Sequence, residues 1–235
     1  MSAFLRSLVF RVGLVFITFA LIPMLLVGLF LPNLKRNDFL ALWSGFVVNW
    51  LKWTCSVDYM VEGIENITAS NAIILSKHQS SWETFGLQAI FPAQTWVLKR
   101  ELLKIPIFGW ALKAAGAIAI DRDAGKAALM QVISEGKDRL EKGYWVVVFP
   151  EGTRTAPGSR GKYNAGGAML ASRSGYPVVP VAHNAGSFWG RGFTIRPGMI
   201  RVMIGKPILT ADRKAGEINA EAEAWIEGRM EEMIS

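Results

Sequence analysis

The chain has 235 residues, of which 51% are hydrophobic and only 19% are charged. Soluble domains carry about 25% charged residues, so this composition excludes a disordered chain, a fibrous repeat and an ordinary cytosolic globule. The net charge of +7 indicates an anionic partner. Because the basic residues are scattered and no nucleic-acid-binding signature occurs, we expect a membrane and no nucleic acid. The single cysteine, Cys55, excludes a disulfide framework and a cysteine-based zinc site.

The first predicted element is an apolar helix. Residues 12–31 carry no charge, and twenty helical residues reach about 30 Å, the thickness of a hydrocarbon core. The run is longer than the apolar core of a signal peptide and lacks its small-residue cleavage site. Basic residues flank the run on both sides, so the positive-inside rule does not choose an orientation.

A second apolar stretch, residues 39–53, carries three tryptophans together with Asn49 and Lys52. It is too short and polar for a span and is typical of an interfacial helix. Two arrangements stay open, namely one span followed by a surface helix, or a helical hairpin dipping into one leaflet. A buried helix of a soluble core is the alternative to both. We predict a helical membrane anchor over residues 1–55 and a single further domain over residues 56–235.

The remaining chain alternates short β-rich runs with helical patterns, which is typical of an α/β domain. Helical spacing of apolar residues predicts helices at 127–140 and 218–234. Strands are predicted at 57–61, 72–75, 95–98, 117–120, 144–149, 178–182, 193–195 and 200–204. The predicted fold is therefore α/β, a layered mixed sheet flanked by helices, with an N-terminal helical membrane anchor.

Candidate catalytic residues follow the second predicted strand, where His78 and Glu83 stand five residues apart in the string HQSSWE. Five residues of one helix turn by about 140°, so the two side chains meet only if the helix begins near Ser80 or Ser81. His78 can then donate from one ring nitrogen to Glu83 and act as a general base with the other. The alternative is a capping box of Ser80 and Glu83 without catalysis.

The string FPEGTRT, residues 149–155, follows a predicted buried strand. It gathers Glu151, Gly152, Thr153 and Arg154 in one loop, which suits a phosphate or a hydroxylated head group, with Arg154 as a bidentate clamp. A turn of solvated charges is the alternative.

A second charged loop, DRD at residues 121–123, follows another strand-like run. Arg122 can join Arg154 at one polyanion, or its own flanking aspartates can pair with it, and the local sequence favours that pairing. The chain contains no nucleophile elbow, Walker loop or Rossmann glycine fingerprint. A base without a protein nucleophile indicates that a substrate supplies the attacking group, as in a transfer reaction.

Taken in order, KHQSSWE, IDR at 120–122, FPEGTRT and VVPVAH at 178–183 resemble the four motifs of the glycerolipid acyltransferases. The resemblance is closest to the bacterial 1-acyl-sn-glycerol-3-phosphate acyltransferases. It implies that His78 takes the proton of the sn-2 hydroxyl of lysophosphatidic acid, which attacks the thioester of acyl-CoA or acyl carrier protein and gives phosphatidic acid. It implies no metal and no cofactor besides these acyl donors. Backbone N–H groups near the helix start after His78 are candidate donors to the oxyanion.

The resemblance also assigns roles to the other motif residues. The family has aspartate where this chain has Glu83, which we retain as the residue that orients His78. The implied shaping residue is Pro180, and we interpret His183 as structural. The resemblance implies that Arg122 binds substrate, in place of the pairing with its flanking aspartates that the local sequence favours. The predicted substrate-binding residues are Arg122, Glu151, Gly152, Thr153, Arg154 and Pro180.

We expect the domain to lie on the cytoplasmic face of a bacterial inner membrane, where a lipid acceptor and a cytosolic acyl donor meet. Within the class, the acceptor can instead be glycerol 3-phosphate, another lysophospholipid or a lyso-aminolipid. Outside the class, the alternative is a catalytically silent lipid-binding protein. A lipid hydrolase is disfavoured because its nucleophile is missing.

Overall fold

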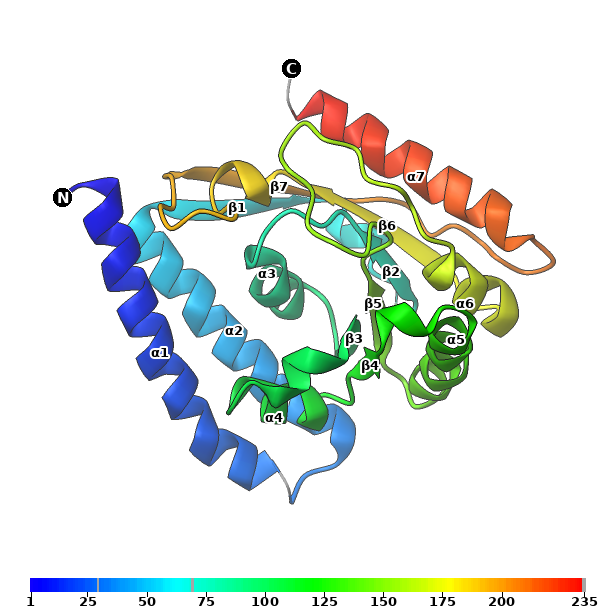
Figure 1. The fold of residues 1–235 in the computed structure, drawn as a ribbon, viewed down its shortest axis with the longest axis horizontal. Coiled ribbons are helices and arrows are strands. Elements are labelled where there is room, and N and C mark those ends of the chain that lie inside the picture. The colour runs from blue at the N-terminus through cyan, green and yellow to red at the C-terminus, as the bar shows by residue number, and fades with distance from the viewer. Residues whose placement is uncertain (29, 69, 234–235) are drawn as a thin grey trace.

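The computed structural model describes residues 1–28, 30–68 and 70–233. Its centre is a seven-stranded sheet of order β1-β7-β6-β2-β5-β3-β4, with helices on both faces (Figure 1). The β6–β7 pair is antiparallel and the other pairs are parallel. The predicted mixed α/β sheet flanked by helices is confirmed.

The bounds of the elements agree closely with most of the predicted ones. The strands are β1 (Val57–Glu62), β2 (Ile73–Ser76), β3 (Gln94–Lys99), β4 (Ile118–Ile120), β5 (Trp145–Val148), β6 (Val178–His183) and β7 (Gly198–Ile204). The α-helices are α1 (Ala3–Gly28), α2 (Asn33–Cys55), α3 (Trp82–Ile90), α4 (Phe108–Ala114), α5 (Lys126–Glu141), α6 (Gly166–Ser174) and α7 (Ala215–Glu232). Residues 29 and 234, which the predicted helices include, lie outside the described residues.

The strand predicted at 193–195 is wrong. These residues lie in the loop that precedes β7. Ile195 is buried there, and its backbone N–H donates to the Ser7 hydroxyl of α1 at 2.8 Å. The segment is therefore apolar because it packs against the N-terminal helix, and its main chain is paired with a side chain instead of a neighbouring strand.

The sheet separates two hydrophobic cores. Successive side chains of a strand point to opposite faces, and in β2 Ile74 belongs to the core under α2 and α3, whereas Ile73 and Leu75 belong to the core under α5, α6 and α7. Every residue of β2 and β5 is buried, as expected for parallel strands covered on both faces.

The first two helices form an antiparallel hairpin along one side of the molecule (Figure 1). The Trp50 indole of α2 donates to the Phe10 carbonyl oxygen of α1 at 3.2 Å. Within the described residues, one segment is long and apolar enough to cross a membrane, Ala3–Ala20 of α1. The inner face of α2, including Val47 and Leu51, joins the core that covers the sheet. The core thus crosses the predicted division at residue 55, and that division stays a prediction.

The parallel strands β2, β4 and β5 end at one edge of the sheet. The loops that follow them carry the strings HQSSWE, DRD and FPEGTRT. Carboxyl ends of parallel strands are where α/β sheets place functional residues, so the topology gathers three of the four motifs at one edge.

Candidate active site

The loop between β2 and α3 brings His78 and Glu83 into contact. The Nδ1 atom of His78 lies 2.5 Å from Oε2 of Glu83. The helix begins only at Trp82, so His78 precedes it and the five-residue spacing no longer separates the two side chains. A buried carboxylate at Nδ1 favours the tautomer with its proton there. The other ring nitrogen, Nε2, then keeps a lone pair that can accept a proton.

Glu83 also caps the loop main chain. Its Oε1 atom accepts the backbone N–H groups of Gln79, at 2.6 Å, and of Ser80. Glu83 therefore does both things that the sequence offered as alternatives. Its Oε2 atom orients the His78 ring, and its Oε1 atom binds the main chain of the loop. These two N–H groups are bound to Glu83, and the oxyanion donors expected near the helix start stay a prediction.

The ring of His78 is held on one face by an aromatic neighbour. It stacks on Phe149, with ring centroids 4.0 Å apart and an angle of 13° between the planes. The His78 side chain keeps 16% of its surface exposed. Stacking and the Glu83 contact together restrict the ring while leaving it accessible to a substrate.

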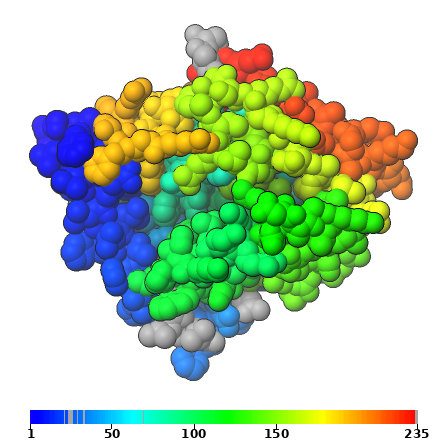
Figure 2. Space-filling view, in the orientation of Figure 1, coloured from blue at the N-terminus to red at the C-terminus, as the bar shows by residue number. Residues whose placement is uncertain are grey.

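His78 lines a cavity of about 100 Å³ that also takes in Arg122 and Arg154. An adjoining cavity of about 240 Å³ shares Arg122 and Phe149 with it and reaches Gly152. Figure 2 shows this face hollowed between the green segment at η2 (Arg100–Lys104) and α4 and the yellow-green loop after β5. A base thus lies beside two guanidinium groups, which suits an anionic substrate.

Arg122 is not paired with its neighbours. Asp121 accepts a hydrogen bond from the backbone N–H of Asp123 at 3.1 Å, and within the described chain neither aspartate forms an ion pair with Arg122. The pairing that the local sequence favoured is therefore absent here. Gly152 makes the turn of the neighbouring loop at φ +67, a conformation that favours glycine.

Three predicted site residues line neither cavity at His78. The Glu151 carboxylate is buried against Lys77 and lines neither cavity at His78. Thr153 is exposed and lines neither cavity. Pro180 lies within β6 and lines a separate cavity of about 410 Å³ beside Trp225 of α7. Pro180 pairs with Leu75 in the middle of β6, so it lies before the strand ends where the loops at His78 begin.

The second histidine, His183, contacts the main chain of the loop that carries His78. His183 is fully buried, its Nε2 lies 2.9 Å from the Lys77 carbonyl oxygen, and its Nδ1 accepts from the Ala185 N–H at 3.3 Å. Desolvation by burial lowers the pKa of His183, although the Glu83 carboxylate opposes that effect. A neutral His183 that donates to the Lys77 carbonyl is consistent with a structural role.

Sequence reasoning missed Lys77, Phe149 and Thr155. The Thr155 N–H donates to the His78 carbonyl oxygen at 2.7 Å. Lys77 did carry a signal, since a lysine directly after the buried run AIILS needs a buried countercharge. Its partners lie 74 and 150 residues away, however, and no local pattern identifies them.

Comparison with known proteins places this geometry in context. Residues 58–184 match the Acyltransferase family. A 1-acyl-sn-glycerol-3-phosphate acyltransferase of Pseudomonas aeruginosa is 46% identical over 209 residues, which cover 86% of this chain and 81% of the relative. One from Saccharomyces cerevisiae is 30% identical over 179 residues, covering 74% and 59%. The crystal structure of a 1-acyl-sn-glycerophosphate acyltransferase from Thermotoga maritima is similar with a TM-score of 0.82 at 25% identity, covering 98% and 95% of the two chains.

Proposed function

The chain belongs to the acyltransferase family, and we propose that it acylates the sn-2 hydroxyl of 1-acyl-sn-glycerol-3-phosphate, giving phosphatidic acid for phospholipid biosynthesis. The acyl donor is acyl-CoA or acyl carrier protein. The observation that carries this proposal is the His78–Glu83 pair on the wall of a cavity that also takes in Arg122 and Arg154. A base for a hydroxyl and clamps for a phosphate then lie in one site.

The proposed reaction is a direct transfer. Nε2 of His78 takes the hydroxyl proton while the oxygen attacks the thioester carbonyl carbon, and the Glu83 carboxylate stabilises the imidazolium that forms. The tetrahedral oxyanion collapses, the C–S bond breaks, and the imidazolium returns its proton to the departing thiolate. General-base catalysis is worth about 10²–10⁴-fold. Because a thioester is already activated, we propose that neither a metal nor a redox cofactor takes part.

The two arginines are proposed to hold the acceptor. Guanidinium groups bind phosphate through paired N–H donors, and neither Arg122 nor Arg154 has an ion-pair partner among the described residues. Both are therefore available to the glycerol-phosphate end of the acceptor, while the hydroxyl to be acylated points at His78. The phosphate fixes the acceptor, and the base selects the reacting oxygen.

We propose that the α1–α2 hairpin lies in one leaflet of the bacterial inner membrane, with the domain on its cytoplasmic face. The outer side of α1 exposes Phe16 and Phe19. The same helix is fastened to the domain, because Arg11 donates to the carbonyl oxygens of Gly192 and Phe193 at 3.2 and 3.0 Å. A helix held along the domain favours a monotopic anchor over a span that leaves it.

Acyl transfer on membranes containing the protein tests the proposal. Lysophosphatidic acid and a long-chain acyl-CoA are supplied to the wild type and to His78→Ala, and phosphatidic acid is measured. Product from the wild type alone supports the proposal. Product with acyl carrier protein only would identify the donor, and product with another lysolipid only would revise the acceptor. No transfer to any of these acceptors would overturn it in favour of a silent lipid-binding protein.

A further inference from the structure

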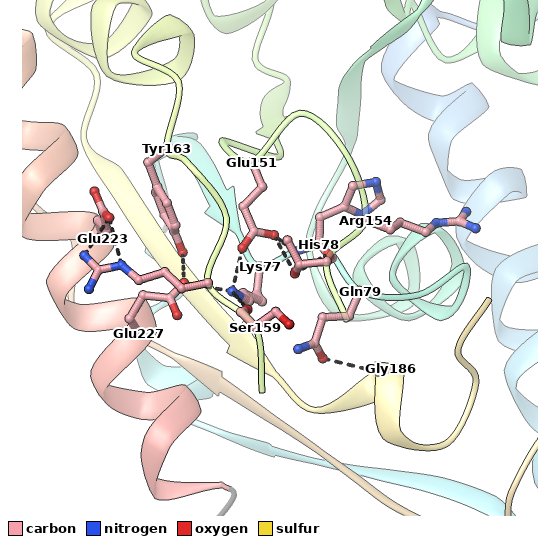
Figure 3. Close-up of polar contacts among 12 residues, drawn as sticks. Lys77, His78, Gln79, Glu151, Arg154, Ser159, Tyr163, Gly186, Glu223 and Glu227 are labelled. Atoms are coloured by element: carbon pink, nitrogen blue, oxygen red, sulfur yellow. Dashed lines mark hydrogen bonds and ion pairs between the residues drawn. The ribbon is translucent and has the colours of Figure 1, made fainter. Parts of the chain in front are cut away.

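A buried lysine lies directly beside the base. Lys77 is 1% exposed, and its Nζ lies 2.5 Å from Oε1 of Glu151, 2.8 Å from Oε1 of Glu227 and 3.1 Å from the Ser159 carbonyl oxygen. Figure 3 shows these partners converging on Lys77 from the loop after β5 and from α7. Three segments far apart in sequence therefore meet at one ammonium group.

The buried ammonium group of Lys77 and the carboxylates of Glu151 and Glu227 stabilise one another. An ammonium group taken out of water is costly unless carboxylates and hydrogen bonds replace its hydration. Glu151 and Glu227 supply the carboxylates, and the Tyr163 hydroxyl donates to Oε1 of Glu227 at 2.7 Å. Burial, together with the hydrogen bond to Glu227, raises the pKa of Tyr163, which keeps its hydroxyl a neutral donor. The Lys77 ammonium group is thus shared by two carboxylates, and a change at Glu227 alters how Lys77 is held against Glu151.

The cluster is connected to the base through Glu151. While Oε1 of Glu151 faces Lys77, its Oε2 accepts the backbone N–H of His78 at 3.2 Å. The FPEGTRT loop also reaches the His78 carbonyl oxygen, through Thr155. The peptide groups on both sides of His78 are thus fixed by a loop whose glutamate is oriented by Lys77. In Figure 3 Arg154 points away from this cluster.

We propose that Lys77 and Glu227 are positioning residues that hold Glu151 against the His78 main chain, so that α7 forms part of the active-site support. The inference rests on the proposed acyl transfer, because it assigns a role relative to its base. Neither residue lines the cavities at His78, so both act through Glu151 without touching the acceptor.

The sharpest test is Glu227→Gln, which preserves size and hydrogen bonding and removes the charge. The matched control is Glu223→Gln, one turn earlier on α7, whose carboxylate pairs with Arg160 at 2.7 Å on the surface. Per folded enzyme, we expect Glu227→Gln to lower kcat about tenfold while the KM values for both substrates change less than about twofold. Glu223→Gln keeps the wild-type kcat, and Glu227→Asp recovers part of the loss.

A second readout does not depend on activity. Hydrogen exchange of the peptide spanning residues 77–83 reports the protection of the His78 N–H. We expect Glu227→Gln, but not Glu223→Gln, to exchange faster there. A lower melting temperature with unchanged kcat and unchanged exchange would overturn the proposal and leave a purely structural ion cluster. A change in KM alone would place Glu227 in substrate binding and would overturn it equally.

The two readouts separate this inference from the proposed function. If the wild type forms no phosphatidic acid, the proposed function fails, and exchange at residues 77–83 still decides whether Glu227 fixes the loop. If the wild type is active and exchange is unchanged in Glu227→Gln, the proposed function stands and the positioning role fails.

Discussion

Glu83 contacts the His78 ring with one carboxylate oxygen and the main chain of the same loop with the other. The orientation of the base and the conformation of the loop that precedes α3 therefore depend on one side chain. Changes at Glu83 are expected to affect catalysis and folding together, whereas changes at His78 affect catalysis alone.

Replacing the base is expected to abolish turnover without unfolding the protein. His78→Ala removes a partly exposed ring and leaves the Glu151 and Thr155 contacts to its backbone in place. We expect kcat to fall by about 10²–10⁴-fold, with a melting temperature within a few degrees of the wild type. Acyl-transfer kinetics and thermal unfolding measure the two effects. A near-normal rate would disprove the base assignment.

Substituting the orienting carboxylate should cost activity and stability at once. Glu83→Gln leaves one carbonyl oxygen for contacts that now use two oxygens. We expect kcat to fall by about 10²–10⁴-fold and unfolding free energy by about 1–3 kcal/mol, the cost of an unsatisfied buried group. Denaturant unfolding and kinetics check both. Lower stability with normal kcat would reduce Glu83 to a helix cap.

The arginine clamp predicts a dependence on the acceptor's phosphate. Arg154→Ala is expected to raise the KM for lysophosphatidic acid about tenfold or more, with a smaller effect on kcat, because it removes a charged hydrogen bond worth about 1.5–3 kcal/mol. With monoacylglycerol, which has no phosphate, wild type and variant should differ little. Steady-state kinetics on both acceptors test this, and equal losses on both would place Arg154 outside the phosphate site.

The buried histidine predicts a loss of stability in acid. The pKa of His183 is lowered by burial from the ordinary value of 6.5, so the unfolded chain binds a proton that the folded protein does not. Stability therefore falls as the pH drops below about 6.5, with a limiting slope of about 1.4 kcal/mol per pH unit for one proton. His183→Gln should fall less steeply. Parallel unfolding curves for both proteins from pH 7.5 to 5 would contradict this.

The monotopic anchor predicts that exposed phenylalanines of α1 bind the bilayer. Phe16 and Phe19 are 70% and 56% exposed, so Phe16→Glu and Phe19→Glu should leave the fold intact. Each buried ring contributes about 1.5–3 kcal/mol, and we expect the double variant to bind anionic vesicles at least about tenfold more weakly. Leu209→Glu, at a residue 74% exposed outside the hairpin, is the matched control. Equal loss in both proteins would point to general destabilisation.

Local patterns predicted most of the strands and the helices α5 and α7, because the spacing of buried apolar residues within one element is visible in a short stretch of sequence. The sequence pattern predicts neither α4 nor α6, and α6 opens on Gly166 and Gly167, which have low helix propensity. The segment 193–195 has the composition of a short strand, although it packs against α1 and its Ile195 N–H is bound by the Ser7 hydroxyl. A short apolar segment therefore predicts that its residues are buried, but it does not predict which element they pack against.

The sequence by itself determined the α/β class, the two apolar N-terminal segments, and the motifs that carry His78, Glu83 and Arg154, because each depends on residues close together in the chain. Only the tertiary structure decided that Arg122 joins the cavity at His78, that Glu151 turns inward to Lys77, and that Pro180 lies beside a different cavity. The pairing of Lys77 with Glu227 spans 150 residues. Such contacts depend on the order and direction of strands in the sheet, and no local spacing of residue types contains that information.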